Sequence, residues 1–248
     1  MLRPHLLLGV TVSSPRQADI REVVAEFVGT ALLLTAVVGS GIMGERLANG
    51  IVGIALLANA LATGAALVAL ILTFGPISGA HFNPLVSFAD AAQGGLTWPR
   101  ACTYALAQLV GAIAGVGVAD YMFQEPAYSL SHRVRSGLPQ ATSEAVATFG
   151  LLAVMVSCSR RRQTAVPFAV GAYITAAYWF TASTSFANPA VTLARAFTDT
   201  FAGVRLADVP MFVLAQAVGA AAATFLFAWL VPVVSAPGVG PADESRIP

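Results

Sequence analysis

The chain has 248 residues, of which 57% are hydrophobic and only 10% are charged, and its 13 basic and 12 acidic residues leave a formal net charge of +1. Soluble domains carry about a quarter charged residues, so this composition excludes a water-soluble globular domain and a disordered chain. The only cluster of basic residues is Arg160–Arg162, which argues against nucleic-acid binding, and a polytopic membrane protein is expected.

Six apolar segments are predicted to cross the bilayer as helices, since a span needs about 20 apolar residues. They lie at residues 23–43, 50–73, 98–119, 141–158, 165–184 and 207–231. These runs are too long and continuous for the alternating strands of a membrane barrel. Residues 1–20 are predicted to be an N-terminal cytoplasmic arm rather than a signal peptide, and residues 233–248 a cytoplasmic tail.

Arginines set the expected orientation, because the chain contains no lysine. If both termini lie in the cytoplasm, eight arginines flank the spans on that side: Arg3, Arg16, Arg21, Arg100, Arg160, Arg161, Arg162 and Arg246. The outer loops then hold four, namely Arg46, Arg133, Arg135 and Arg205. The positive-inside rule therefore predicts cytoplasmic N- and C-termini.

The two halves of the chain repeat the same landmarks in the same order. A glutamate opens the first and fourth spans (Glu26 and Glu144), and an Asn-Pro pair and an Ala-Gln-x-Val-Gly-Ala segment follow in each half. We expect a first repeat at 21–119, an extracellular linker at 120–140 and a second repeat at 141–232. Because each half has three spans, the second repeat is inverted in the membrane, which places a site at the midplane between the halves.

Each Asn-Pro pair predicts the start of a helix too short to span, at 83–93 and 188–198. Asparagine is a favoured N-cap and proline suits the first helical position. Half-helices that enter from opposite faces bring two positive dipole ends together at the midplane, where Asn83 and Asn188 add hydrogen-bond donors. Such a constriction tolerates a neutral dipolar molecule and repels protons and cations.

This arrangement resembles the major intrinsic protein (aquaporin and aquaglyceroporin) superfamily over about residues 20–232. The resemblance is carried by Ser78-Gly79-Ala80-His81-x-Asn83-Pro84, by Asn188-Pro189-Ala190, and by Glu26 and Glu144. It implies an all-α membrane protein with six transmembrane helices plus two re-entrant half-helices in an inverted 3+3 repeat, assembled as a homotetramer with one pore per subunit. It also implies that the two glutamates brace the pore loops and that His81 lines the pore near its cytoplasmic end.

Two positions depart from the pattern of the superfamily. Leu85 replaces the alanine of the first Asn-Pro-Ala, and a tolerated packing change is expected there. Val191 stands where water-selective relatives have arginine. Valine is also found at this position in the bacterial, metalloid-linked branch that this chain resembles. The residues that match the outer selectivity filter are Thr63, Ala176, Ser185 and Val191, which predicts a filter without an aromatic ring or a charge.

Two assignments near the filter stay open. A register shift in the fifth span would make Ile174 or Tyr173, rather than Ala176, face the pore. Arg195 lies about one helical turn after Val191, and it either reaches back toward the filter or pairs with the loop or a carboxylate such as Asp199. The second arrangement is the one favoured by the sequence.

The leading hypothesis is a passive channel in the inner (cell) membrane of a bacterium for small uncharged solutes. Glycerol-like polyols, urea and neutral metalloid hydroxides such as arsenite are the candidates, together with water. The alternatives are a water-selective channel with an atypical filter and a proton-coupled secondary transporter that uses Glu26 or Glu144. The sequence has no nucleophile–base set, metal cluster or phosphate loop, so neither an enzyme nor a cofactor is expected; the expected partners are the lipid bilayer, the solute and further copies of the chain.

Overall fold

The computed structural model describes residues 15–232, and every regular element in that range is helical. In chain order, the helices are α1 (Pro15–Leu47), α2 (Val52–Ser78), α3 (Pro84–Ala92), α4 (Trp98–Phe123), α5 (Leu138–Arg161), α6 (Val166–Phe180), α7 (Pro189–Ala194) and α8 (Val209–Leu230). Short 3₁₀ turns, at Gln163–Ala165, Arg195–Phe197 and Leu206–Asp208, precede α6, follow α7 and precede α8. The elements form the aquaporin-like fold of six helices and two half-helices that the sequence predicts.

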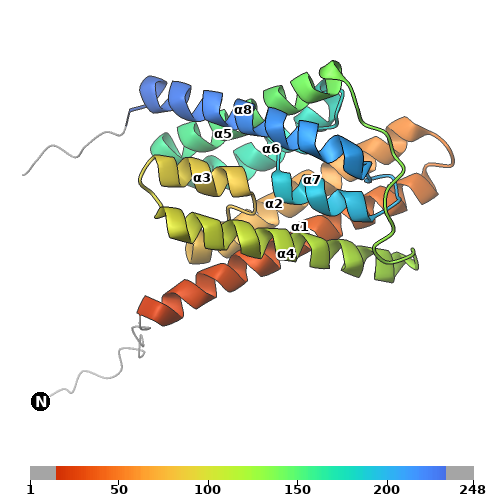
Figure 1. Cartoon of the computed structure of the whole chain (residues 1–248), viewed down its shortest axis with the longest axis horizontal. Coiled ribbons are helices and arrows are strands. Elements are labelled where there is room, and N and C mark those ends of the chain that lie inside the picture. The colour runs from red at the N-terminus through yellow and green to blue at the C-terminus, as the bar shows by residue number, and fades with distance from the viewer. Residues whose placement is uncertain (1–14, 233–248) are drawn as a thin grey trace, which may run out of the picture.

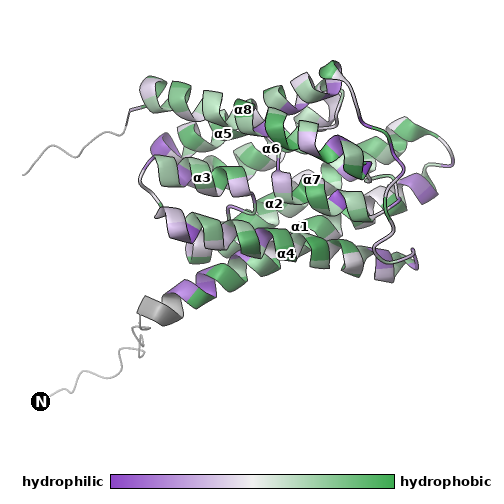
Figure 2. Ribbon diagram, viewed as in Figure 1, coloured by the Kyte–Doolittle hydropathy of each residue, from purple (hydrophilic) through white to green (hydrophobic). Residues whose placement is uncertain are grey.

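Five helices, α1, α2, α4, α5 and α8, are long and apolar enough to cross a membrane. The fifth predicted span, 165–184, is shorter than expected, because α6 ends at Phe180 and the chain then leaves the helical conformation. At 1.5 Å per residue, its 15 residues extend about 22 Å. The helices are largely hydrophobic (Figure 2), and exposed leucines such as Leu57, Leu106 and Leu214 give the bundle a surface that suits contact with lipid.

The first helix begins earlier than predicted. Residues 15–20, which were expected in the arm, belong to α1. The carboxylates of Asp19 and Glu22 both pair with Arg100 at the start of α4, so this end of α1 is tied to the bundle. The remainder of the predicted arm, residues 1–14, and the predicted tail, residues 233–248, lie outside the described residues.

The inverted repeat is visible in how the helices pack. In the first half α1 packs against α2 and α4, and in the second half α5 packs against α6 and α8. A glycine permits a close backbone approach at the matching place of each half: a Cβ at Gly111 would strike the carbonyl oxygen of Phe27, and one at Gly219 would strike that of Ala145. The backbones of α1 and α4, and of α5 and α8, therefore touch at matching places.

The half-helices α3 and α7 occupy opposite halves of the bundle along its long axis (Figure 1). The start of α1 and the end of α8 lie on one side of the molecule, called here the inner side. The loop between α4 and α5, residues 124–137 of the predicted linker, lies on the opposite, outer side. The N-termini of α3 and α7 meet between these two sides and position the site.

Candidate functional site

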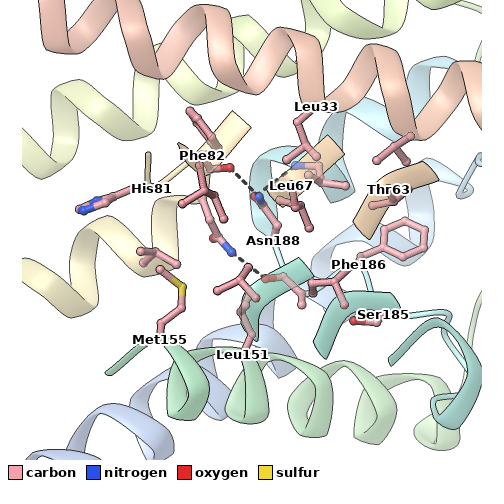
Figure 3. A pocket seen from close by; sticks show the side chains of 18 of the residues that line it. Leu33, Thr63, Leu67, His81, Phe82, Leu151, Met155, Ser185, Phe186 and Asn188 are labelled. Atoms are coloured by element: carbon pink, nitrogen blue, oxygen red, sulfur yellow. Dashed lines mark hydrogen bonds between the residues drawn. The ribbon is translucent and has the colours of Figure 1, made fainter. Parts of the chain in front are cut away.

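The two asparagines at the starts of α3 and α7 each cap a helix and also hold the opposite loop. The Asn83 side-chain oxygen accepts a hydrogen bond from the Leu85 backbone at 3.0 Å, and that of Asn188 accepts one from the Ala190 backbone at 2.9 Å. The two Nδ2 groups are used reciprocally across the molecule (Figure 3). Asn83 donates to the Ala187 carbonyl at 2.8 Å, and Asn188 donates to the Phe82 carbonyl at 2.7 Å.

The reciprocal bonds fix the two helix N-termini against each other at the middle of the protein. Each amide group has two N–H donors, and one of them is used in this way. The second N–H of each asparagine remains for a molecule in the pore. Together with the positive ends of the two helix dipoles, this gives the midplane a positive potential.

The loops before the asparagines share an unusual backbone conformation. The residues one and three positions before each asparagine have positive φ angles: Ala80 (51°) and Phe82 (48°) in the first loop, and Ser185 (51°) and Ala187 (50°) in the second. Non-glycine residues pay about 1–2 kcal/mol for this region. The strained backbone turns consecutive N–H groups toward one side, where a buried carboxylate accepts them.

Glu26 and Glu144 are those carboxylates, and both are fully buried. Glu26 accepts the backbone N–H groups of His81 (2.9 Å) and Phe82 (2.8 Å), the Ser78 hydroxyl (2.6 Å) and the Gln108 amide (2.8 Å). These bonds satisfy both oxygens of the carboxylate and hold the first loop.

In the second half Glu144 makes the matching contacts. Its oxygens accept the backbone N–H groups of Phe186 (2.9 Å) and Ala187 (2.8 Å) and the Gln216 amide (2.6 Å). Neither glutamate lines the central cavity. Each carboxylate therefore serves as a fixed acceptor for a pore loop.

A narrow cavity of about 60 Å³ runs past the two asparagines. In Figure 3 it extends from His81 and Met155 at one end to Thr63 and Ser185 at the other. Of the predicted pore residues, those that line it are Thr63, His81, Asn83, Ser185, Asn188 and Val191. The structure thus brings together most of the positions singled out in the sequence.

His81 connects this cavity with a wider vestibule of about 300 Å³ on the inner side, because the residue lines both. Its Nδ1 lies 3.0 Å from the Ser87 hydroxyl, and its ring packs edge-on against Tyr104. Asp90 and Arg160 line the vestibule but not the narrow cavity. The inner mouth therefore carries a fixed imidazole followed by charged side chains.

The prediction that Ala176 lines the pore is wrong. Ala176 is exposed on the surface of the single chain, whereas Ile174 and Tyr178 of the same helix are buried and line the cavity. Tyr173, the other open alternative, does not line it and instead donates a hydrogen bond to the Ala147 carbonyl at 3.1 Å. A pattern that sequence reasoning missed points the right way, since Val170, Ile174 and Tyr178 recur every four residues along one helix face.

The predicted filter without a ring or a charge is also corrected. Tyr178 and Phe186 both line the outer part of the cavity, and the Tyr178 hydroxyl lies 3.2 Å from that of Thr63. The outer end thus combines hydroxyl groups with the apolar walls of Val191 and Ile174. It is more polar, and more aromatic, than the sequence predicted.

Leu85 points away from this cavity. It is half-buried and lines a separate apolar crevice between α3 and α8, together with residues such as Ala217 and Ala221. The extra bulk relative to alanine is thus accommodated by small residues of α8. Pro84 and Pro189 are the first residues of their helices, and Ala190 is buried and does not line the cavity.

Arg195 pairs with the loop, as one form of the arrangement favoured by the sequence predicts, but it does not pair with Asp199. Asp199 instead accepts the backbone N–H of His132 at 2.9 Å and lies 3.0 Å from the His132 ring, and these bonds lower the pKa of its carboxyl group. Arg195 is buried, lines the outer part of the cavity and donates from Nε to the Ala202 carbonyl. Within residues 19–232 no group of three or more potential metal ligands gathers at any point.

Comparison with known proteins supports the same arrangement. Residues 13–185 match the model of the family described as "Major intrinsic protein". The protein described as "Aquaglyceroporin AqpS" of Rhizobium meliloti (strain 1021) is 54% identical over 211 residues, which cover 85% of this chain and 90% of the relative. A "Probable aquaporin TIP-type" of Medicago truncatula is 30% identical over 199 residues, 73% of this chain and 78% of the relative. The X-ray structure of the aquaglyceroporin from Plasmodium falciparum superimposes with a TM-score of 0.67 at 23% identity and covers 86% of this chain and 98% of that one.

Proposed function

The chain belongs to the major intrinsic protein family and is a membrane channel for small solutes rather than an enzyme, and we propose that the solutes are uncharged molecules larger than water. Glycerol-like polyols and neutral metalloid hydroxides such as arsenite are the classes that we expect to pass, together with water. The relative described as an aquaglyceroporin, which aligns over most of both chains, supports this class of solute.

The observation that carries the proposal is the mixed apolar and polar lining at the outer end of the cavity. Val191, Ile174 and Phe186 offer apolar surface, while Thr63 and Ser185 offer hydroxyl groups. A polyol carries both C–H and hydroxyl groups. The apolar residues can contact its C–H groups and the hydroxyl residues can replace its hydrogen bonds to water, so its transfer from water into the cavity costs little free energy. Valine at position 191 also leaves space that a longer, charged side chain would fill.

Exclusion of protons and other ions is the second part of the proposal. The starts of α3 and α7 bring two positive dipole ends to the midplane, where Asn83 and Asn188 hold one another's loops. A cation at that point is repelled, and a chain of water molecules must turn its oxygens toward the donors. This arrangement supports passage of neutral molecules alone.

Replacing Val191 by arginine tests the proposal in proteoliposomes. Val191→Arg places a long, charged group in the cavity, and we expect it to reduce glycerol and arsenite permeability by about tenfold or more while water permeability stays near that of the wild type. Val191→Met, which has similar length but no charge, separates the effect of size from the effect of charge. Unchanged solute flux in Val191→Arg would contradict the proposal.

A water-selective channel is the second candidate, and one observation favours it. The hydroxyl groups of Thr63 and Tyr178 lie 3.2 Å apart at the outer end, and this contact narrows the passage. Stopped-flow light scattering separates the two candidates, since a water-selective channel raises osmotic water permeability without raising glycerol permeability.

A proton-coupled transporter finds less support. Glu26 and Glu144 are fully buried, each carboxylate accepts at least three hydrogen bonds, and neither lines the cavity. A coupling group must exchange protons with the solution during each cycle, and these carboxylates have no open path to the pore. We expect uptake that neither saturates nor depends on a proton gradient.

The cellular setting is proposed on the same basis. We place the protein in the inner membrane of a bacterium as a homotetramer, with both termini in the cytoplasm; the greater number of arginines flanking the spans on that side supports this orientation. In this orientation the vestibule beside His81 and Asp90 opens to the cytoplasm, and the Thr63–Ser185 end opens to the outside.

A further inference from the structure

Arg195 is a buried positive charge without a carboxylate partner. It is only 2% exposed, and within residues 15–232 no acidic side chain forms an ion pair with it. Its Nε donates to the Ala202 carbonyl, and its guanidinium carbon lies 3.4 Å from the centre of the Phe186 ring. Burying an unpaired charge destabilises a folded protein. A function of the charge, in addition to packing, would explain why it is buried here.

The cavity supplies that reason, because Arg195 lines it at the outer end. Within the described residues its two terminal nitrogens make no hydrogen bond, which leaves their N–H donors for whatever occupies the cavity. The Ser185 hydroxyl lines the same part of the cavity, is buried and also lacks a partner in the described residues. Two unsatisfied polar groups thus face one narrow space, and a buried polar group is normally hydrogen-bonded.

Arg135, a half-buried arginine of the α4–α5 loop, has a structural role that contrasts with that of Arg195. Arg135 approaches the same Phe186 ring, with its guanidinium carbon 5.2 Å from the ring centre. Its donors are directed to the carbonyl groups of Gly203, Ser183 and Phe201 in the outer loops, and it does not line the cavity. Arg135 thus holds the loops, whereas Arg195 lines the cavity and its terminal nitrogens make no hydrogen bond within the described residues.

We propose that Arg195 is the specificity-determining charge of the outer pore: its guanidinium and the Ser185 hydroxyl bind the oxygen atoms of a passing solute, and its positive charge repels cations. The inference rests on the proposed function, since it assumes that neutral solutes use this cavity. Val191 lies one helical turn before Arg195 and lines the same cavity. The pore thus keeps a positive charge one turn further out while position 191 stays apolar.

The test uses the full-length protein in proteoliposomes and three substitutions. Arg195→Met removes the charge at similar length, and Arg195→Lys keeps the charge but loses the planar donor group. Arg205→Met is the matched control, because Arg205 is an arginine of the same outer region that pairs with Asp208 away from the cavity. Glycerol permeability is measured by light scattering, and the leak of protons and Na⁺ is measured with lumenal dyes under an imposed potential.

We expect Arg195→Met to raise the cation leak about fivefold to tenfold, the scale of one charge about 4 Å away in a water-filled pore. Arg195→Lys should keep the leak low, and Arg205→Met should match the wild type in both measurements. A leak unchanged in Arg195→Met would overturn the proposal, and so would an equal rise in the Met and Lys variants, which would assign the effect to lost packing.

A further variant covers the case in which Arg195→Met does not assemble. Arg195→Gln keeps a donor for the Ala202 carbonyl but has no charge, and it should leak as Arg195→Met is expected to. If neither neutral variant forms a folded channel, Arg195 acts as a structural residue and the proposal is overturned. If the wild type passes no glycerol, the proposed function fails, while the comparison of leaks still tests the charge.

Discussion

At the outer end of the pore, α7 presents Val191 and the 3₁₀ turn after it presents Arg195 to the cavity, whereas at the inner end α3 presents Val86 to the cavity and Asp90 to the vestibule. Arg195 stands seven residues after Asn188, as Asp90 stands seven residues after Asn83. The repeat thus places a charged side chain at the same point of each half-helix but with opposite sign. The residue two positions before each asparagine differs as well, His81 at the inner end and Phe186 at the outer end.

The parts that do not differ are those that hold the loops. Each half uses a buried glutamate, a buried glutamine, an asparagine cap and left-handed residues at the same two positions. The comparison teaches that the shared set builds the two re-entrant loops, while the residues that differ give the two mouths their separate chemistry. Substitutions in the shared set should damage both halves alike, and substitutions at the differing positions should change selectivity.

The largest effect is expected at the shared glutamates. Glu26→Gln and Glu144→Gln each put an amide N–H group against backbone N–H donors, and charge-assisted bonds of about 1.5–3 kcal/mol each are lost. We expect the free energy of unfolding to fall by at least about 3 kcal/mol in both variants, and further in Glu26→Gln, because Glu26 also accepts the Ser78 hydroxyl. Thermal unfolding in detergent measures this difference.

Glu45→Gln is the control for these variants, since Glu45 is an exposed carboxylate paired with Arg133 at the outer side. It should change stability by less than about 1 kcal/mol. A Glu144 variant as stable as the wild type would break the equivalence of the two halves. Stable variants that lose only proton-dependent uptake would instead favour a coupled transporter.

A smaller effect on glycerol permeability is expected from substitutions in α6. This helix has one residue that lines the cavity and one that lies on the surface, and the two can be compared directly. Ile174→Ala should widen the cavity and raise glycerol permeability about twofold to threefold, because Ile174 is buried against it. Ala176→Val should leave permeability unchanged, because Ala176 is on the outer surface. Both permeabilities are measured by light scattering. A change in Ala176→Val without a change in Ile174→Ala would show that Ala176, rather than Ile174, lines the filter.

Much of the fold could be predicted from the sequence, because long apolar runs and two Asn-Pro pairs have few structural solutions in a membrane. The six predicted spans all form helices, five of them long enough to cross a membrane and α6 shorter than predicted, and the inverted repeat and the starts of α3 and α7 at Pro84 and Pro189 are confirmed. The start of α1 was missed, since its polar first turns are stabilised by pairing with Arg100, a contact distant in sequence.

The filter was harder to predict, for a physical reason. Counting back twelve residues from Asn188 crosses residues 181–187, which are not helical and include positive φ angles at Thr184, Ser185 and Ala187. The helical phase of α6 is not carried through such a stretch, so Ala176 was placed in the pore instead of Ile174 and Tyr178. The direction of the Arg195 side chain likewise depends on the 3₁₀ turn that follows α7, and the sequence has no signal that predicts this turn.

The central claim is that neutral solutes larger than water cross this pore passively. The direct measurement is stopped-flow light scattering of proteoliposomes with the wild-type chain, mixed with hyperosmotic glycerol or with hyperosmotic sucrose. We predict rapid shrinkage in both, followed in glycerol alone by re-swelling at least about tenfold faster than in protein-free liposomes, with an initial rate that rises linearly with glycerol concentration. Re-swelling no faster than in protein-free liposomes, alongside rapid water flow, would contradict the claim and identify a water-selective channel.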